Sequence, residues 1–150
     1  MSAHIVAVCL SQAKGERKSP ADEVMLRAGH GLAGDAHAGT WHRQVSLLAM
    51  ESIRKMQQLG LAVDTGDFAE NLTTEGIDLP ALPIGARLKI ADTLLEITQI
   101  GKECHTRCAI YHQAGDCVMP KEGVFARVLA GGPVRPGDAI TVLIDEAGTG

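Results

Sequence analysis

Apolar and polar residues alternate along several short stretches of this 150-residue chain. Alternation with a period of two is the pattern of a β-strand that buries one of its faces. It predicts strands at residues 4–9, 23–26, 44–48 and 139–144. Cys9, at the end of the first stretch, is expected to be a small buried apolar residue.

The strongest strand signal lies in the middle of the chain, where residues 87–90 and 94–100 flank the short turn 91–93. These two runs predict a β-hairpin in which Lys89, Glu96 and Thr98 face outward. The residues expected to face inward are Leu88, Ile90, Leu95 and Ile97.

Two stretches have helical rather than strand spacing. Residues 49–58 carry large apolar residues three positions apart, and Gly60 follows as a stop signal. Val124–Ala130 is predicted to form a second, short helix that ends at Gly131 and Gly132.

The remaining stretches are polar or rich in glycine and proline, which predicts loops. Residues 11–22, 29–39 and 68–76 are of this kind, and two prolines exclude a central strand at residues 79–85. Gly29, Gly31 and Gly34 match the letters of a dinucleotide-binding loop. No helix-forming run follows them, so that function is not favoured.

Short strands, few helices and 17 glycines predict a mainly β fold with a few short helices, arranged as a closed or partly closed β-barrel. A length of 150 residues suits one domain spanning residues 1–150. Residues 1–3 and 145–150 are expected to be frayed ends of that domain.

The net charge and the first residues of the chain limit the kinds of partner that are expected. A formal charge of −4 argues against general nucleic-acid binding, which needs a basic surface. The apolar run HIVAVC is too short for a membrane span or a secretion signal, so a cytoplasmic protein without a membrane partner is expected. In that compartment four cysteines are expected to be free, catalytic or metal-bound rather than paired in disulfides.

Candidate chemistry is concentrated in residues 101–123, which hold three of the four cysteines and two of the six histidines. Lys102 and Arg107 are close in sequence to Cys104 and Cys108. A neighbouring cation favours the thiolate, which attacks electrophiles and binds soft metals. The spacing of the cysteines matches no common closed zinc module. A zinc site remains an alternative, with Cys104, Cys108, Cys117 and either His105 or His112 as its ligands.

Four separated segments together resemble the MOSC domain family, which forms the C-terminal part of molybdenum cofactor sulfurases and also occurs as small standalone bacterial proteins. The segments are 31–39 (GLAGDAHAG), 43–48 (RQVSLL), 70–78 (ENLTTEGID) with 84–90 (IGARLKI), and 107–108 (RC). The resemblance runs in the family's order from about Val6 to Ile144 and includes the turn VRPGD at 134–138. Standalone members often have Pro-Arg-x-Pro-Cys at the functional thiol, where this chain has KECHTRC, so Cys104 is a second candidate.

The resemblance implies a MOSC-type β-barrel that works with the molybdenum cofactor (molybdopterin), a pterin dithiolene bearing a phosphate. It implies that Cys108 is the catalytic thiol, as a molybdenum ligand or a sulfur carrier, with Cys104 as a second catalytic candidate. Arg43 and Arg107 suit a phosphate, because a guanidinium can bind it in two places. The further cofactor-binding candidates are Lys102, His37, His42, Asn71 and Thr73. The binding cleft is expected between the hairpin 87–100 and the loops 29–43 and 67–76.

The favoured function is to bind the cofactor or to carry sulfide for it. The first alternative is a molybdenum-dependent reductase of N-hydroxylated compounds that works with partner electron-transfer proteins, and the second is a zinc-binding structural domain. Whether the chain is an enzyme is left open. The resemblance does not extend to the aminotransferase-like domain of full sulfurases, so no pyridoxal phosphate is expected in this chain alone. The expected partners are molybdenum cofactor biosynthesis proteins or molybdoenzymes, and the oligomeric state is open.

Overall fold

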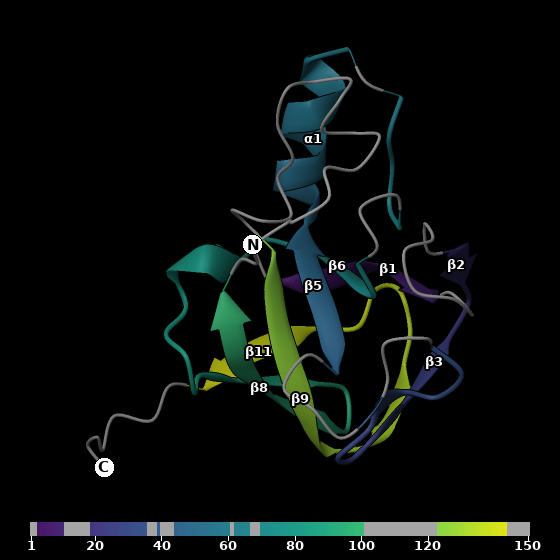
Figure 1. Ribbon diagram of the computed structural model, residues 1–150, viewed down its shortest axis with the longest axis vertical. Coiled ribbons are helices and arrows are strands. Elements are labelled where there is room, and N and C mark those ends of the chain that lie inside the picture. The colour runs from purple at the N-terminus through teal and green to yellow at the C-terminus, as the bar shows by residue number, and fades with distance from the viewer. Residues whose placement is uncertain are drawn as a thin grey trace.

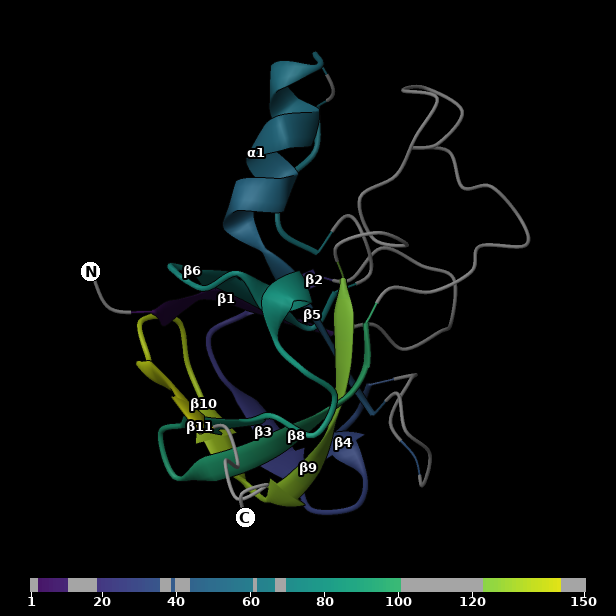
Figure 2. The ribbon, with the colours of Figure 1, turned by 90° about the vertical axis from the view of Figure 1, so that its left-hand side faces the viewer.

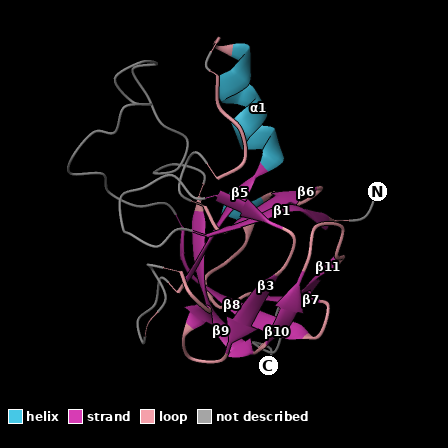
Figure 3. Ribbon diagram, turned by 90° about the vertical axis from the view of Figure 1, so that its right-hand side faces the viewer, coloured by secondary structure: helices cyan, strands magenta, loops and turns pink. Residues whose placement is uncertain are grey.

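A computed structural model describes residues 3–10, 19–35, 39, 44–60, 62–66, 70–100 and 123–143 of the chain. These residues are mainly β, with one α-helix and one short 3-10 helix (Figures 1 and 3). The strands and helices are β1 (His4–Leu10), β2 (Ser19–Ala21), β3 (Val24–Arg27), β4 (Gly31–Leu32), β5 (Val45–Ala49), α1 (Met50–Gln58), β6 (Leu72–Glu75), η1 (Leu79–Ala81), β7 (Arg87–Ile90), β8 (Thr93–Ile100), β9 (Val124–Ala130), β10 (Gly132–Val134) and β11 (Ile140–Leu143).

The strands form two sheets. The larger has eight strands in the order β11-β7-β8-β9-β5-β6-β1-β2, and the smaller has the order β10-β3-β4. All pairings between these strands are antiparallel except that of β5 with β6. Both sheets contribute to one hydrophobic core, which includes Ile5, Leu47, Leu72, Leu88 and Ile97 from the larger sheet and Val24, Leu26, Leu32 and Val134 from the smaller.

The larger sheet is open: β11 and β2 are its two edges. The prediction of a closed barrel is therefore wrong, while the prediction of a mainly β fold is confirmed. The reason lies in β1, whose second half pairs with β2 from Val8 to Leu10. The start of β1 contacts the residue before β11 through an isolated bridge between His4 and Ala139. A bridge of this kind brings the two strands together without continuing the ladder.

The predicted hairpin is confirmed as β7 and β8, which pair from Arg87 with Glu96 to Ile90 with Thr93. The side chains expected to face inward have no exposed area: Leu88, Ile90, Leu95 and Ile97. Ala91 takes a positive φ of 53° in the turn, and the Thr93 hydroxyl donates a hydrogen bond of 2.7 Å to the Ile90 carbonyl. Alternation and turn chemistry agree here, which is why the sequence pattern predicts the hairpin correctly.

The predicted helix at Val124–Ala130 is wrong, because this segment is strand β9. It lies between β5 and β8, and pairs with β8 from Val124 to Ala130 and with β5 from Val124 to Ala126. Those partners are distant in sequence, so the ladder is invisible to local spacing. Gly131 is also no helix stop: a Cβ there would lie 2.5 Å from the Leu26 carbonyl oxygen, so glycine is needed for the close approach of β3.

Three short strands lie where the sequence predicts loops: β2, β4 and β6. β2 contains Pro20 and lies at the edge of the larger sheet, where a missing N–H is tolerated. β6 lies within the polar run 68–76, yet Leu72, Thr73 and Thr74 have no exposed area. Hydrophobic alternation cannot detect a strand whose buried side chains are polar.

Helix α1 confirms the prediction for residues 49–58 within one residue. Ser52, Ile53 and Met56 form its buried face, and Gly60, with φ of 90°, follows its end. Figure 2 shows α1 extending from the end of β5 beyond the sheet. Neither helix among the described residues is long and apolar enough to cross a membrane.

Gly31 is a site where alanine should be poorly tolerated. Its φ is +120°, and a Cβ there would lie 2.5 Å from the Gln44 carbonyl oxygen. We expect Gly31→Ala to lower the free energy of unfolding by about 3 kcal/mol, from backbone strain and the clash together. Gly34→Ala is the matched control, because Gly34 has φ of +84° and open space around the Cβ position. It should cost about 1 kcal/mol by chemical denaturation, and equal costs would rule out the clash.

Candidate functional site

The structure describes two of the predicted site residues, Asn71 and Thr73. The others lie outside the described residues: Cys108, Cys104, Arg43, His37, His42, Arg107 and Lys102. The remaining residues of the zinc alternative, Cys117, His105 and His112, lie outside them as well. Their roles stay predictions.

Asn71 has no exposed area and joins β1 to β5. Its side-chain Oδ1 accepts hydrogen bonds from the Ser46 backbone N–H at 3.0 Å and from the Ser46 hydroxyl at 3.1 Å. Its Nδ2 donates to the Cys9 carbonyl at 3.2 Å. The Asn71 backbone N–H also reaches Ser46, at 2.9 Å from the carbonyl oxygen and 3.0 Å from Oγ. These bonds give Asn71 a structural role just before β6, and its predicted contact with the cofactor stays a prediction.

Glu70 is a buried carboxyl group beside Asn71, and the sequence analysis did not single it out. Its Oε2 accepts two hydrogen bonds of 2.8 Å, from the Gly66 backbone N–H and from the Thr73 hydroxyl. Both Glu70 and Thr73 have no exposed area. Burial of a carboxylate is costly unless it is hydrogen-bonded, so these bonds hold the turn at Gly66 against β6. The signal in the sequence is the polar pair Glu70-Asn71 placed directly before β6.

Neighbouring threonines of β6 differ in their hydrogen bonding. Thr73 donates to Glu70, whereas Thr74 Oγ1 is buried with no hydrogen-bond partner among the described residues. We therefore expect Thr73→Val to lower the free energy of unfolding by about 1–2 kcal/mol and Thr74→Val to raise it by about 1 kcal/mol. Each variant controls for the other, since both keep a β-branched side chain of similar size. Urea unfolding measures the two values, and effects of the same sign would contradict the assignment.

The two ends of the segment 101–123 are held together by the larger sheet. Ile100 at the end of β8 pairs with Val124 at the start of β9, and Val124 also pairs with Leu47 of β5. The chain therefore leaves and re-enters the sheet beside the end of β5, where α1 begins. This is the region of the fold from which the cysteine-rich sequence extends.

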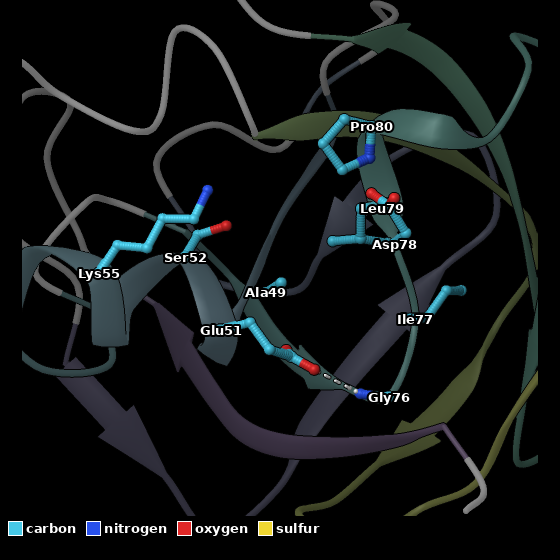
Figure 4. Close-up of a pocket in the computed structure, with 9 residues that line it drawn as sticks. All are labelled: Ala49, Glu51, Ser52, Lys55, Gly76, Ile77, Asp78, Leu79 and Pro80. Carbon is cyan, nitrogen blue, oxygen red and sulfur yellow. Dashed lines mark hydrogen bonds between the residues drawn. The ribbon is translucent and has the colours of Figure 1, made fainter.

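A cavity of about 440 Å³ lies at the same end of the sheet, between α1 and the chain that follows β6 (Figure 4). Ala49 is the last residue of β5, and Glu75 is the last residue of the parallel strand β6. Ala49 lines the cavity, and so does Gly76, the residue that follows Glu75. Open sheets commonly bind ligands beyond the carboxyl ends of parallel strands. The lining residues are Ala49, Glu51, Ser52, Lys55, Gly76, Ile77, Asp78, Leu79 and Pro80. The sequence analysis did not predict this cavity, because it missed β6 and therefore the β5–α1–β6 unit.

One hydrogen bond and one ion pair hold α1 to the end of β6, and His4 of β1 adds a contact there. Glu51 Oε2 accepts a hydrogen bond of 3.0 Å from the Gly76 backbone N–H, and this bond joins the two walls of the cavity (Figure 4). Arg54 lies 2.5 Å from one carboxylate oxygen of Glu75, and His4 lies 3.3 Å from the other. The two walls of the cavity, α1 and the chain that follows β6, are therefore fixed to one another.

The described residues do not themselves form a site for the cofactor that the resemblance implies. Cys9 is the single described cysteine, and it has no exposed area within β1. Among the described residues, no group of three or more histidine, cysteine or acidic side chains could hold a metal ion. The cavity carries two carboxylates, Glu51 and Asp78, against one ammonium group, Lys55. That balance disfavours a phosphate-bearing anion.

A family model of the MOSC domain matches residues 34–141. The chain belongs to the MOSC domain family. This confirms the resemblance seen in the four sequence segments. The match includes β5 to β9 and the segment 101–123, so it covers the cavity, the cysteine-rich sequence and the larger sheet apart from β1, β2 and the end of β11.

Solved structures show the same fold. The YuaD protein from Bacillus subtilis has a TM-score of 0.78 at 19% identity, over 95% of this MOSC domain protein and 96% of that chain. YiiM from Geobacillus stearothermophilus has a TM-score of 0.72 at 20% identity, over 97% of this chain and 77% of that chain. YiiM from Escherichia coli has a TM-score of 0.65 at 20% identity, over 96% and 70%. No curated protein matches this chain.

Proposed function

We propose that this MOSC domain protein works with the molybdenum cofactor, by binding it or by carrying sulfide for it, and that Cys108 is the thiol responsible. The observation that carries the proposal is the family match over residues 34–141, which includes Arg107 and Cys108. The connection of the cysteine-rich segment to the sheet also supports the proposal, because Ile100 and Val124, which flank the segment, pair with each other beside β5.

The chemistry of Cys108 fits either task. A sulfur carrier needs a thiolate that can hold a persulfide, and a soft metal centre accepts a thiolate ligand. Lys102 and Arg107 favour that thiolate because they are close in sequence to Cys108, with Cys104 as a second candidate. Arg43 and Arg107 are the proposed phosphate ligands, with His37 and His42 as further contacts.

The cavity beside α1 is not the proposed cofactor site, because its carboxylates outnumber its ammonium groups. Bound cofactor would supply a molybdenum centre for oxygen or sulfur transfer. No part of that chemistry is assigned to Cys9, Glu70 or the cavity residues.

A cofactor-binding or sulfide-carrying role is favoured over a self-sufficient reductase. The sequence has no flavin, haem or iron–sulfur motif, so reduction of N-hydroxylated compounds would need partner electron-transfer proteins. The proposed partners are molybdenum cofactor biosynthesis proteins or molybdoenzymes, and the proposed compartment is the cytoplasm.

The test is the metal and pterin content of the protein purified from cells that make the cofactor. Molybdenum with pterin, or a persulfide detected by mass spectrometry, is the expected result. Zinc retained through dialysis, with neither molybdenum, pterin nor persulfide, would overturn the proposal in favour of a zinc-binding domain. Rapid turnover of an N-hydroxylated base with general electron-donor proteins would instead favour the reductase.

A further inference from the structure

The cavity beside α1 has a chemistry of its own. Its apolar lining residues are Ala49, Ile77, Leu79 and Pro80. Ala49 and Leu79 are buried, so the apolar surface that a ligand can reach belongs mainly to the half-buried Ile77 and Pro80. A volume of about 440 Å³ lies within the range of small-molecule sites.

Asp78 is the charged group in the cavity that is available to a ligand. Among the described residues its carboxylate makes no hydrogen bond and no ion pair, although it sits at the start of η1, where it could have capped the helix. Glu51 uses one oxygen for the Gly76 N–H. Lys55 contributes one positive charge to the lining, so the cavity carries two carboxylates against one ammonium group.

The start of α1 does not convert this cavity into an anion site. The first turn of a helix attracts negative charge, but here Glu51 already occupies that turn. An incoming anion would meet both Glu51 and Asp78. An incoming cation would meet two carboxylates and one ammonium group beside an apolar surface, a balance of charge that favours a cationic head on an apolar body.

We infer that the cavity binds a small organic cation, with an ammonium or amidinium group at Asp78 and an apolar body against Ile77 and Pro80. The ligand enters at the carboxyl ends of β5 and β6. Binding in this cavity needs neither molybdenum nor Cys108 and is separate from the proposed function. The cavity is then a second binding site of the MOSC domain, at the end of the sheet where the cysteine-rich segment begins and ends.

Benzylamine is a suitable probe, with benzyl alcohol and benzoate as neutral and anionic controls of the same shape. In an NMR titration at pH 7, benzylamine should shift the backbone amide signals of Ser52, Gly76 and Ile77 saturably, with a Kd of about 1 mM for a ligand of this size. Benzyl alcohol should bind about fivefold more weakly, and benzoate should leave these signals unchanged.

Substitution of Asp78 makes the test specific. Asp78→Asn should weaken benzylamine binding about fivefold, and Asp78→Lys should abolish it and allow benzoate to bind. The matched control is Asp92→Asn, since Asp92 is an exposed aspartate in the β7–β8 turn. Unchanged thermal unfolding would show that the variants are folded. No saturable shift, equal affinity for benzyl alcohol, or the same loss with Asp92→Asn would overturn the inference.

Discussion

Replacing Cys108 by serine is expected to abolish retention of molybdenum and formation of a persulfide while the protein stays folded. Serine is nearly isosteric with cysteine, but its hydroxyl is neither a soft metal ligand nor a sulfur carrier. Metal analysis of the purified variant measures the first loss. Mass spectrometry after treatment with a polysulfide measures the second, because a thiolate can accept one sulfane sulfur atom from a polysulfide and release the shortened polysulfide. Each should fall at least about tenfold, as expected when the single group that carries the chemistry is removed.

The controls for Cys108 are the other thiols. Cys9→Ser should leave both measurements unchanged, because Cys9 is buried in β1 and has no exposed area. Cys104→Ser should have an intermediate effect if the two thiols cooperate. Retention of molybdenum and sulfide by Cys108→Ser, at the level of the unmodified protein, would refute the role of Cys108. So would labelling at neutral pH that finds Cys108 the least reactive of the four thiols.

The largest loss of stability should come from Asn71→Ala. The variant leaves the Ser46 N–H, the Ser46 hydroxyl and the Cys9 carbonyl without their side-chain partner inside the core. An unsatisfied buried polar group costs about 1–3 kcal/mol, so the free energy of unfolding should fall by about 3–4 kcal/mol. For a chain of this size that corresponds to a decrease in Tm of about 10 °C.

Ser46→Ala tests whether the loss belongs to this network. It removes one hydroxyl and should cost about 1 kcal/mol, and the double variant should cost less than the sum of the two, because they share hydrogen bonds. Additive costs would place the effect of Asn71 outside its contacts with Ser46. A Tm for Asn71→Ala within about 2 °C of the unmodified protein would contradict the structural role.

The predictable part of the fold is the part that local pattern determines. The β7–β8 hairpin has apolar alternation and a suitable turn, and α1 has apolar residues at helical spacing and a glycine after its end. β9 is not predicted, because Val124–Ala130 is stabilised by two ladders to residues far away in sequence. β6 is not predicted either, because its buried threonines look like loop residues.

The candidate site also has a part that the sequence predicts and a part that it does not. The sequence identifies the residue types suited to sulfur and phosphate chemistry, because cysteine, arginine and lysine carry that information individually. It does not reveal that Asn71 is committed to Ser46 and Cys9, since those contacts span 25 and 62 positions. The cavity beside α1 depends on the parallel pairing of β5 and β6, which no local pattern encodes.

The single parallel pair also bears on how the chain folds. β7 and β8 are joined by two residues and can pair as soon as they meet, whereas β5 and β6 require the crossover through α1 to close first. β1 must wait for β6, with which it pairs across more than sixty positions. Closure of long loops slows folding, so this topology places the β1–β6–β5 junction, including Asn71, among the late contacts. Variants at Asn71 should therefore act more on the unfolding rate than on the folding rate.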